Sequence, residues 1–142
     1  MRKLDPVRRR TILVTGLIAA AILVLLLPIQ GRTKADRGKT NEERLAFLNS
    51  LGWEAEEVPC KEQMIQLPRV FPEVLLKYNE LQEAQGFDLT KYAGKTVTMY
   101  CYRLTQPEGA DETFATLYVY KNRIIGGDIH STALDGEMRG LR

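Results

Sequence analysis

The fold is decided by residues 95–131, which read KTVTMYCYRLTQPEGADETFATLYVYKNRIIGGDIHS. Within this stretch, the side chains of residues 95–104 and 113–120 alternate in character at a period of two, so that successive residues would point to opposite faces of a strand. That alternation is typical of strands in which one face is buried. A third apolar segment, residues 124–131, follows closely. The stretch therefore predicts a three-stranded antiparallel meander.

Two pairs of residues shape this meander. Asn122 and Arg123 predict a tight hairpin turn, because Asn tolerates positive φ. Gly126 and Gly127 lie inside the third strand, where they indicate a weakened segment or a bulge. Long connections are absent between these strands, so we expect them to pair in the order of the sequence.

A helix is predicted upstream, where Thr40 and Glu43 have the spacing of a capping box. Leu45 and Leu48 then recur at helical spacing, with Phe47 beside them. Gly52 ends the helix, because glycine adopts the left-handed conformation readily.

One strand and a second helix come between this helix and the meander. Residues 54–67 are extended, and Pro59 predicts an edge strand that is bent or split there. The second helix begins at Pro72 and ends at Gly86. Its expected buried face is Val74, Leu75, Tyr78 and Leu81. We expect both helices to pack on one face of an antiparallel sheet, which makes residues 40–142 a small α+β domain.

A transmembrane helix is predicted at the other end of the chain. Residues 11–29 contain no charged side chain over 19 positions. A bilayer core about 30 Å thick needs roughly 20 helical residues. The alternative is a cleaved signal peptide, but its apolar region usually has about 7–15 residues and ends at a small-residue site. Residues 28–32 offer no such site, so we interpret the segment as a retained anchor.

The flanking charges predict the orientation of this anchor. Five Lys or Arg residues precede it in a basic tail, residues 1–10, and four follow it in a polar linker, residues 30–39, that we expect to be flexible. Arg8, Arg9 and Arg10 adjoin the span, where they would contact anionic lipid headgroups. We therefore expect a single-pass cell-membrane protein with a cytoplasmic N-terminus and the domain outside.

The charge distribution excludes nucleic acid as a partner. Residues 1–40 carry nine Lys or Arg and two acidic residues, whereas residues 41–142 carry eleven Lys or Arg and sixteen acidic residues. A nucleic-acid interface needs a basic patch on the folded domain, and this domain is acidic.

Residues with catalytic or metal-binding chemistry are few. His130 is the only histidine, so a two-histidine zinc motif is excluded. Cys60 and Cys101 have no C-x-x-C spacing. Together with Asp128 and His130 they would form a zinc site, or a Cys–His nucleophile, only if the fold brought them together. We predict no catalytic residue, no metal and no cofactor.

The aromatic residues of the meander suggest a binding surface. Tyr100, Tyr102, Tyr118 and Tyr120 recur at spacing two in adjacent predicted strands. Some must line the core, and the others would present aromatic rings to a partner. Asp128 and His130 would extend that surface, or they would simply line a solvated strand face.

A disulfide between Cys60 and Cys101 is left open by the sequence. An external domain would allow the two residues to pair, provided that their strands are neighbours. Pro59 and the alternation around Cys101 both suggest side chains that point elsewhere. We therefore favour two unreactive thiols over a bridge.

The sequence also resembles a bacterial family known as domain of unknown function 4830. Residues 41–53 (NEERLAFLNSLGW), 78–98 (YNELQEAQGFDLTKYAGKTVT) and 125–136 (IGGDIHSTALDG) carry the resemblance. It implies a single N-terminal span with a small domain behind it. It implies no activity, substrate or catalytic residue.

Together these features predict a membrane-anchored, non-catalytic binding or regulatory module. Its partners would be the bilayer and an unknown protein or envelope ligand. Two alternatives are a small cell-envelope hydrolase and an assembly subunit that acts through its span, where Gly16 and Ala20 have small-xxx-small spacing.

Overall fold

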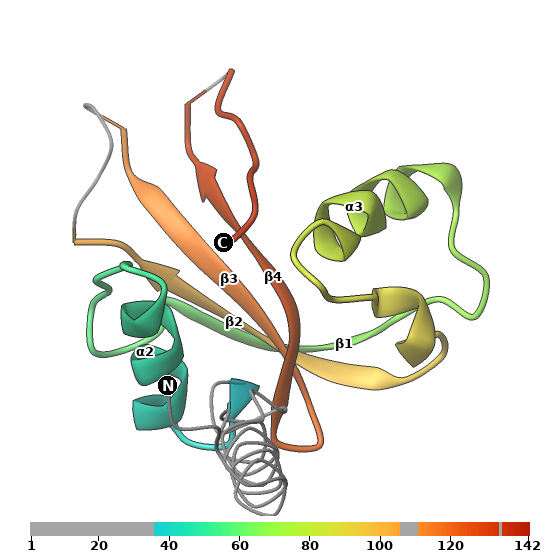
Figure 1. Cartoon of the computed structure of the whole chain (residues 1–142), viewed down its shortest axis with the longest axis horizontal. Coiled ribbons are helices and arrows are strands. Elements are labelled where there is room, and N and C mark those ends of the chain that lie inside the picture. The colour runs from blue at the N-terminus through green and yellow to red at the C-terminus, as the bar shows by residue number, and fades with distance from the viewer. Residues whose placement is uncertain (1–35, 106–110, 134) are drawn as a thin grey trace, which may run out of the picture. The chain divides into compact units, whose positions relative to one another are not determined.

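The computed structural model describes residues 36–105, 111–133 and 135–142 (Figure 1). The expected basic tail, transmembrane helix and most of the linker are residues 1–35, so these predictions lie outside the described ranges. Among the described residues, no helix has the length and apolar character needed to cross a membrane.

The described residues form an α+β domain, as predicted. Its elements, in chain order, are α2 (Asn41–Ser50), β1 (Lys61–Gln66), α3 (Glu73–Glu83), the 3-10 helix η2 (Leu89–Tyr92), β2 (Thr96–Arg103), β3 (Thr113–Tyr120) and β4 (Arg123–Ser131). The sheet has four strands in the order β1-β2-β3-β4, and every pair is antiparallel. The expected meander of three strands is thus a meander of four, because β1 pairs with β2 despite the helix between them in the sequence.

Local signals set the boundaries of these elements. The capping box of α2 is present, with the Glu43 N–H donating to Thr40 Oγ1 at 3.2 Å. Pro59 does interrupt the extended segment before β1, and the part of that segment before Pro59 joins the sheet through an isolated bridge, Ala55 to Leu104.

The hairpin between β3 and β4 differs slightly from its prediction. Lys121 and Asn122 carry the positive φ values, 45° and 66°, so the turn lies one residue earlier than expected. Val119 pairs with Ile124 while Tyr118 pairs with Gly126. This leaves Ile125 as the extra residue of a β-bulge, close to the glycines that predicted one.

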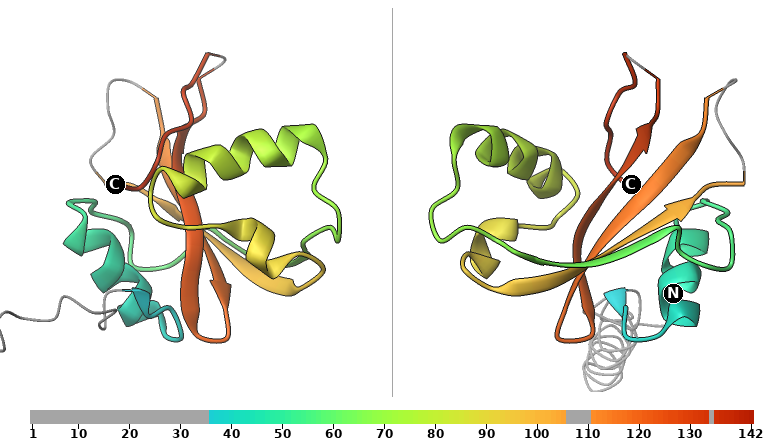
Figure 2. Two further views of the ribbon diagram at one scale, coloured as in Figure 1. Left: turned by 45° about the vertical axis from the view of Figure 1, so that its right-hand side comes forward. Right: turned by 180° about the vertical axis from the view of Figure 1, so that it is seen from behind.

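The two helices cover opposite faces of the sheet (Figure 2). We expected both on one face, and that expectation is wrong because the central strands are apolar on both sides. One core cluster joins Leu48 of α2 to Tyr102 and Leu117. The other joins Leu89 of η2 to Val97, with the rings of Tyr78, Tyr92, Tyr118 and Tyr120 packed against it. We refer to these as the α2 face and the α3 face.

The last residues of the expected linker belong to the domain. The Gly38 N–H donates to the Asn122 carbonyl at 3.0 Å, and Gly38 is buried. A Cβ at Gly38 would lie 2.8 Å from Ile124 Cγ1, so the backbone packs directly on β4. Residues 36–39 therefore hold the N-terminal end of the domain against the hairpin.

Candidate functional site

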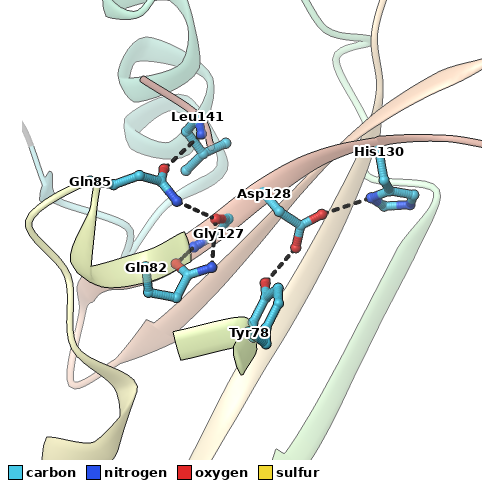
Figure 3. Close-up of polar contacts among 7 residues, drawn as sticks. All are labelled: Tyr78, Gln82, Gln85, Gly127, Asp128, His130 and Leu141. Atoms are coloured by element: carbon cyan, nitrogen blue, oxygen red, sulfur yellow. Dashed lines mark hydrogen bonds and ion pairs between the residues drawn. The ribbon is translucent and has the colours of Figure 1, made fainter. Parts of the chain in front are cut away.

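Buried amide side chains attach helix α3 and the residues just after it to the sheet. Gln82 is fully buried. Its Nε2 donates to the Gly127 carbonyl at 3.0 Å, and the Gly127 N–H donates to its Oε1 at 2.9 Å (Figure 3). Gln85 Nε2 donates to the same carbonyl at 3.1 Å, and its Oε1 accepts from the Leu141 N–H at 2.6 Å. The amides thereby satisfy backbone groups of the outer strand β4.

Glycine is required where these amides meet β4. A Cβ at Gly127 would lie 2.2 Å from the Thr116 carbonyl oxygen, and one at Gly126 would lie 2.8 Å from Gln82 Oε1. Real Cβ atoms do not approach so closely. Gly126 therefore lets α3 approach the strand backbone, as glycine within a strand often does, whereas Gly127 leaves room for β3 and Leu141.

Next to this attachment, a buried carboxylate joins α3 to the end of β4. Asp128 Oδ2 accepts a hydrogen bond from the Tyr78 hydroxyl at 2.5 Å, and Oδ1 lies 2.9 Å from His130 Nδ1 (Figure 3). The Asp128 side chain is almost fully buried, whereas about a third of the His130 side chain is exposed. The His130 ring stacks on Phe114 at 5.7 Å between centroids. The structure thus brings together two of the predicted site residues, Asp128 and His130, and adds Tyr78.

The environment keeps the tyrosines of this site protonated. Burial, followed by the nearby Asp128 carboxylate, raises the pKa of Tyr78 far above its usual value. Burial also raises the pKa of Tyr118, whose ring meets that of Tyr78 edge to face at 6.3 Å. The Tyr78 hydroxyl therefore remains a hydrogen-bond donor to Asp128 at neutral pH.

The Asp128 carboxylate orients the histidine. A carboxylate beside Nδ1 favours the proton on that nitrogen, which leaves the Nε2 lone pair to face outward. Such an oriented imidazole can accept a hydrogen bond or take part in proton transfer. Cys101 is not its partner, because β3 runs between β2 and β4.

An apolar groove of about 600 Å³ lies beside this network. It is lined by residues of α3, by Tyr118 and by one residue of the C-terminal segment: Val74, Leu75, Lys77, Tyr78, Leu81, Tyr118 and Met138. Val74 is 72% exposed and Met138 is 51% exposed. The stripe that we expected to form the buried face of this helix therefore lines an open groove. The expectation holds for Tyr78, which packs against the core of the α3 face, and it is wrong for Val74, which is exposed.

The four meander tyrosines do not form one surface. Tyr102 is fully buried on the α2 face, where its hydroxyl accepts from Arg44 Nε at 2.7 Å and donates to Asn41 Oδ1 at 2.8 Å. Tyr100 lies on the same face, with the Arg44 guanidinium 3.6 Å above its ring.

Tyr118 and Tyr120 lie on the α3 face. Tyr118 lines the groove, and Tyr120 packs edge to face on Tyr92 at 5.4 Å between centroids. Of the four, Tyr118 is thus the one that borders the groove.

The two cysteines lie at the junction of β1 and β2. Cys60 is exposed, Cys101 is half-buried, and both are thiols. Burial, followed by the neighbouring Cys60 thiol, raises the pKa of Cys101 to about 11. A cysteine that attacks external substrates rapidly at neutral pH has the opposite shift. Within the described ranges, no three His, Cys, Asp or Glu side chains gather closely enough to hold a metal ion.

Sequence reasoning missed Gln82 and Gln85 altogether, and it placed Tyr78 on the buried face of the helix without its hydrogen bond to Asp128. The two glutamines are one helical turn apart, next to the Gly86 that ends α3. Together with the glycine pair in a strand, this spacing was a usable signal for a close approach of helix to strand. Nothing in the local pattern pointed to β4 as the strand concerned.

A scan against protein-family models identifies residues 47–129 as Domain of unknown function (DUF4830). The chain belongs to this family. The match covers more than half of the chain and confirms the resemblance inferred from the sequence. It reaches from α2 to Ile129, so the DUF4830 region includes Tyr78, Gln82 and Asp128 and stops one residue before His130. No curated protein and no solved structure matches the chain.

Proposed function

We propose that this DUF4830 domain is a non-catalytic binding or regulatory module, held at the outer face of a bacterial cell membrane by residues 11–29. One observation carries the binding role: α3 turns its apolar stripe toward a groove and buries its amides. A helix normally buries its apolar stripe against the core. The groove has a volume of about 600 Å³, within the range of about 300–1,000 Å³ typical of small-molecule sites.

The polar groups near the groove suit recognition better than catalysis. The Asp128 carboxylate is occupied by Tyr78 and His130, and no buried side-chain polar atom among the described residues lacks a hydrogen-bond partner. A ligand with an apolar body would fill the space between Val74 and Met138. Lys77 at the lining would favour an acceptor or an anionic group on that ligand.

Binding to the groove is testable with an anilinonaphthalene sulfonate dye, which has an apolar body and an anionic group. The full chain is kept in solution by an amphiphilic polymer that does not fluoresce. We expect the dye fluorescence to rise and saturate with the wild type, and we expect no such rise with Val74→Glu or Met138→Glu. Val70→Glu is the matched control, because Val70 is 84% exposed and does not line the groove. Equal binding by all four proteins would remove the groove from the proposal.

The membrane orientation needs a separate test. Protease added to intact cells without their wall should digest residues 40–142, because the flanking charges favour an external domain. Protection in intact cells, with digestion only after lysis, would place the domain inside.

The alternative of a small hydrolase is favoured by one observation, the Asp128–His130 pair. A carboxylate on Nδ1 would let Nε2 activate a water molecule. Turnover of chromogenic esters that is abolished by His130→Gln, in a variant with an unchanged melting curve, would favour the hydrolase over the binding module.

A further inference from the structure

The chain segment before β1 brings Cys60 next to Cys101. In the register of the sheet, Lys61 is directly opposite Cys101, so Cys60 is one residue from that position. The Cys60 N–H donates to the Cys101 carbonyl at 2.8 Å, and its Sγ lies 3.2 Å from the same oxygen. The side chain of Cys60 is therefore turned toward Cys101, which the sequence alone did not predict.

This placement meets the distance requirement for a covalent bond. Opposed residues of antiparallel strands have Cα atoms about 4.5–5.5 Å apart, and a shift of one residue adds about 3.3 Å along the strand, so this register places the Cα atoms of Cys60 and Cys101 about 6 Å apart. A disulfide needs about 4.4–6.8 Å between Cα atoms. Cys60 precedes the regular part of β1, so its side chain is not held by the alternation of the strand.

We propose that Cys60 and Cys101 form a redox-active pair that closes to an intramolecular disulfide by exchange with a low-molecular-weight disulfide. Cys60 is exposed and meets the oxidant first. Its thiolate attacks one sulfur of the external disulfide, which forms a mixed disulfide and releases one thiolate. Cys101 then loses its proton to solvent and attacks the Cys60 sulfur, which releases the second thiolate. Two protein thiols are oxidised, one external disulfide is reduced to two thiols, and the two protons pass to the leaving groups.

The environment of Cys101 suits the residue that attacks second, after Cys60 has formed the mixed disulfide. Burial and the neighbouring thiol raise its pKa to about 11, so it reacts slowly with external reagents. Once Cys60 carries a mixed disulfide, the attack becomes intramolecular and has a high effective concentration. Exposure and burial thus assign the order in which the two residues react.

Closing the bridge would stabilise the domain. The loop from Cys60 to Cys101 contains β1, α3 and η2. For a loop of about 40 residues, the chain-entropy model lowers the unfolding equilibrium constant by about a thousandfold. The oxidised domain should therefore unfold at a higher urea concentration than the reduced domain.

The test uses the full chain in detergent micelles, equilibrated with mixtures of reduced and oxidised glutathione and quenched in acid. By intact mass, we expect the wild type to lose two hydrogen atoms without gaining glutathione. Cys101→Ser should instead accumulate one glutathione, mapped to Cys60. Cys60→Ser should react much more slowly, because only the half-buried thiol remains.

Three results would overturn the proposal. In the first, the wild type keeps glutathione on Cys60 with Cys101 free. In the second, both thiols remain unmodified in the most oxidising mixture. In the third, the bridged protein unfolds in urea at the same concentration as the reduced protein or a lower one, which would mean that the bond forms only by distorting the sheet.

Discussion

Removing the side-chain amide of Gln82 should loosen α3 from the sheet. Gln82→Ala deletes the two hydrogen bonds to Gly127, at 2.9 and 3.0 Å, in a fully buried site. The Gly127 carbonyl keeps a bond from Gln85, but the Gly127 N–H loses the Gln82 acceptor. An unpaired buried donor costs about 1–3 kcal/mol, and a lost hydrogen bond costs about 1 kcal/mol. We therefore expect a decrease of about 2–4 kcal/mol in the free energy of unfolding.

A second variant, Gln82→Glu, isolates the contribution of the Nε2 group that donates to the Gly127 carbonyl. The introduced carboxylate can still accept from the Gly127 N–H, but it faces the Gly127 carbonyl with a negative oxygen. Burial should hold the folded-state pKa of this group above the unfolded value of about 4.3. A raised folded pKa means that the folded state binds more protons. Stability should therefore be greatest below about pH 4.3, and it should be lost as the pH rises through the folded pKa.

Urea unfolding followed by the fluorescence of Trp53 measures both effects. Trp53 is the only tryptophan, and its Nε1 donates to the Leu141 carbonyl at 2.7 Å, so it reports on the core. Glu83→Ala is the matched control, because Glu83 is exposed on the same helix. A Gln82→Ala loss no larger than that of Glu83→Ala would refute the reasoning, since the amides would then be dispensable. If the free energy of unfolding of Gln82→Glu does not rise toward low pH, the role assigned to the Gln82 Nε2 donor is refuted.

Two further predictions concern the core and the tyrosines. Residues 36–142 should fold alone, and Leu48→Asp should abolish the cooperative melt of this fragment, because Leu48 is fully buried and a charge there would have no partner. The control Val70→Asp should leave the melt unchanged. A normal melt for Leu48→Asp would mean that the core is misplaced. The pKa of Tyr78 is raised on folding, so its stabilising contribution is complete below the unfolded value of about 10 and is lost as the pH rises above it. Thermal melts from pH 8 to 11 should therefore fall less steeply for Tyr78→Phe than for the wild type, and identical slopes would contradict the assigned burial.

Several elements could be predicted from the sequence because their causes are local. The capping box between Thr40 and Glu43 satisfies backbone donors within a single turn, and it is present. Gly52 and Gly86 follow the two helices with φ of 88° and 84°, the conformation that predicted them as helix ends. Strand β3 has the predicted bounds, since alternation at a period of two needs only neighbouring residues. Membership of the DUF4830 family was likewise readable from the order of residues.

The candidate site could not be predicted, because it depends on which elements meet. The apolar stripe of α3 predicted burial of Val74 and Tyr78 on the core side. Tyr78 does pack against the core, but Val74 stays exposed, and the prediction overlooked the backbone of β4, whose Gly127 is satisfied by Gln82, one helical turn after Tyr78. Burying these strong hydrogen-bonding groups unpaired would cost more than leaving a few apolar side chains at the surface.

The sequence by itself therefore determined the α+β class, the order of the elements and their ends, because local periodicity and capping control these features. Only the tertiary structure decided which face of the sheet each helix covers and which side of α3 is buried. It also brought Asp128 and His130 together with Tyr78, and Cys60 next to Cys101. The contacts of Tyr78 with Asp128 and of Cys60 with Cys101 join residues far apart in the chain, because they follow from the docking of α3 on β4 and from the pairing of β1 with β2, which no single segment contains.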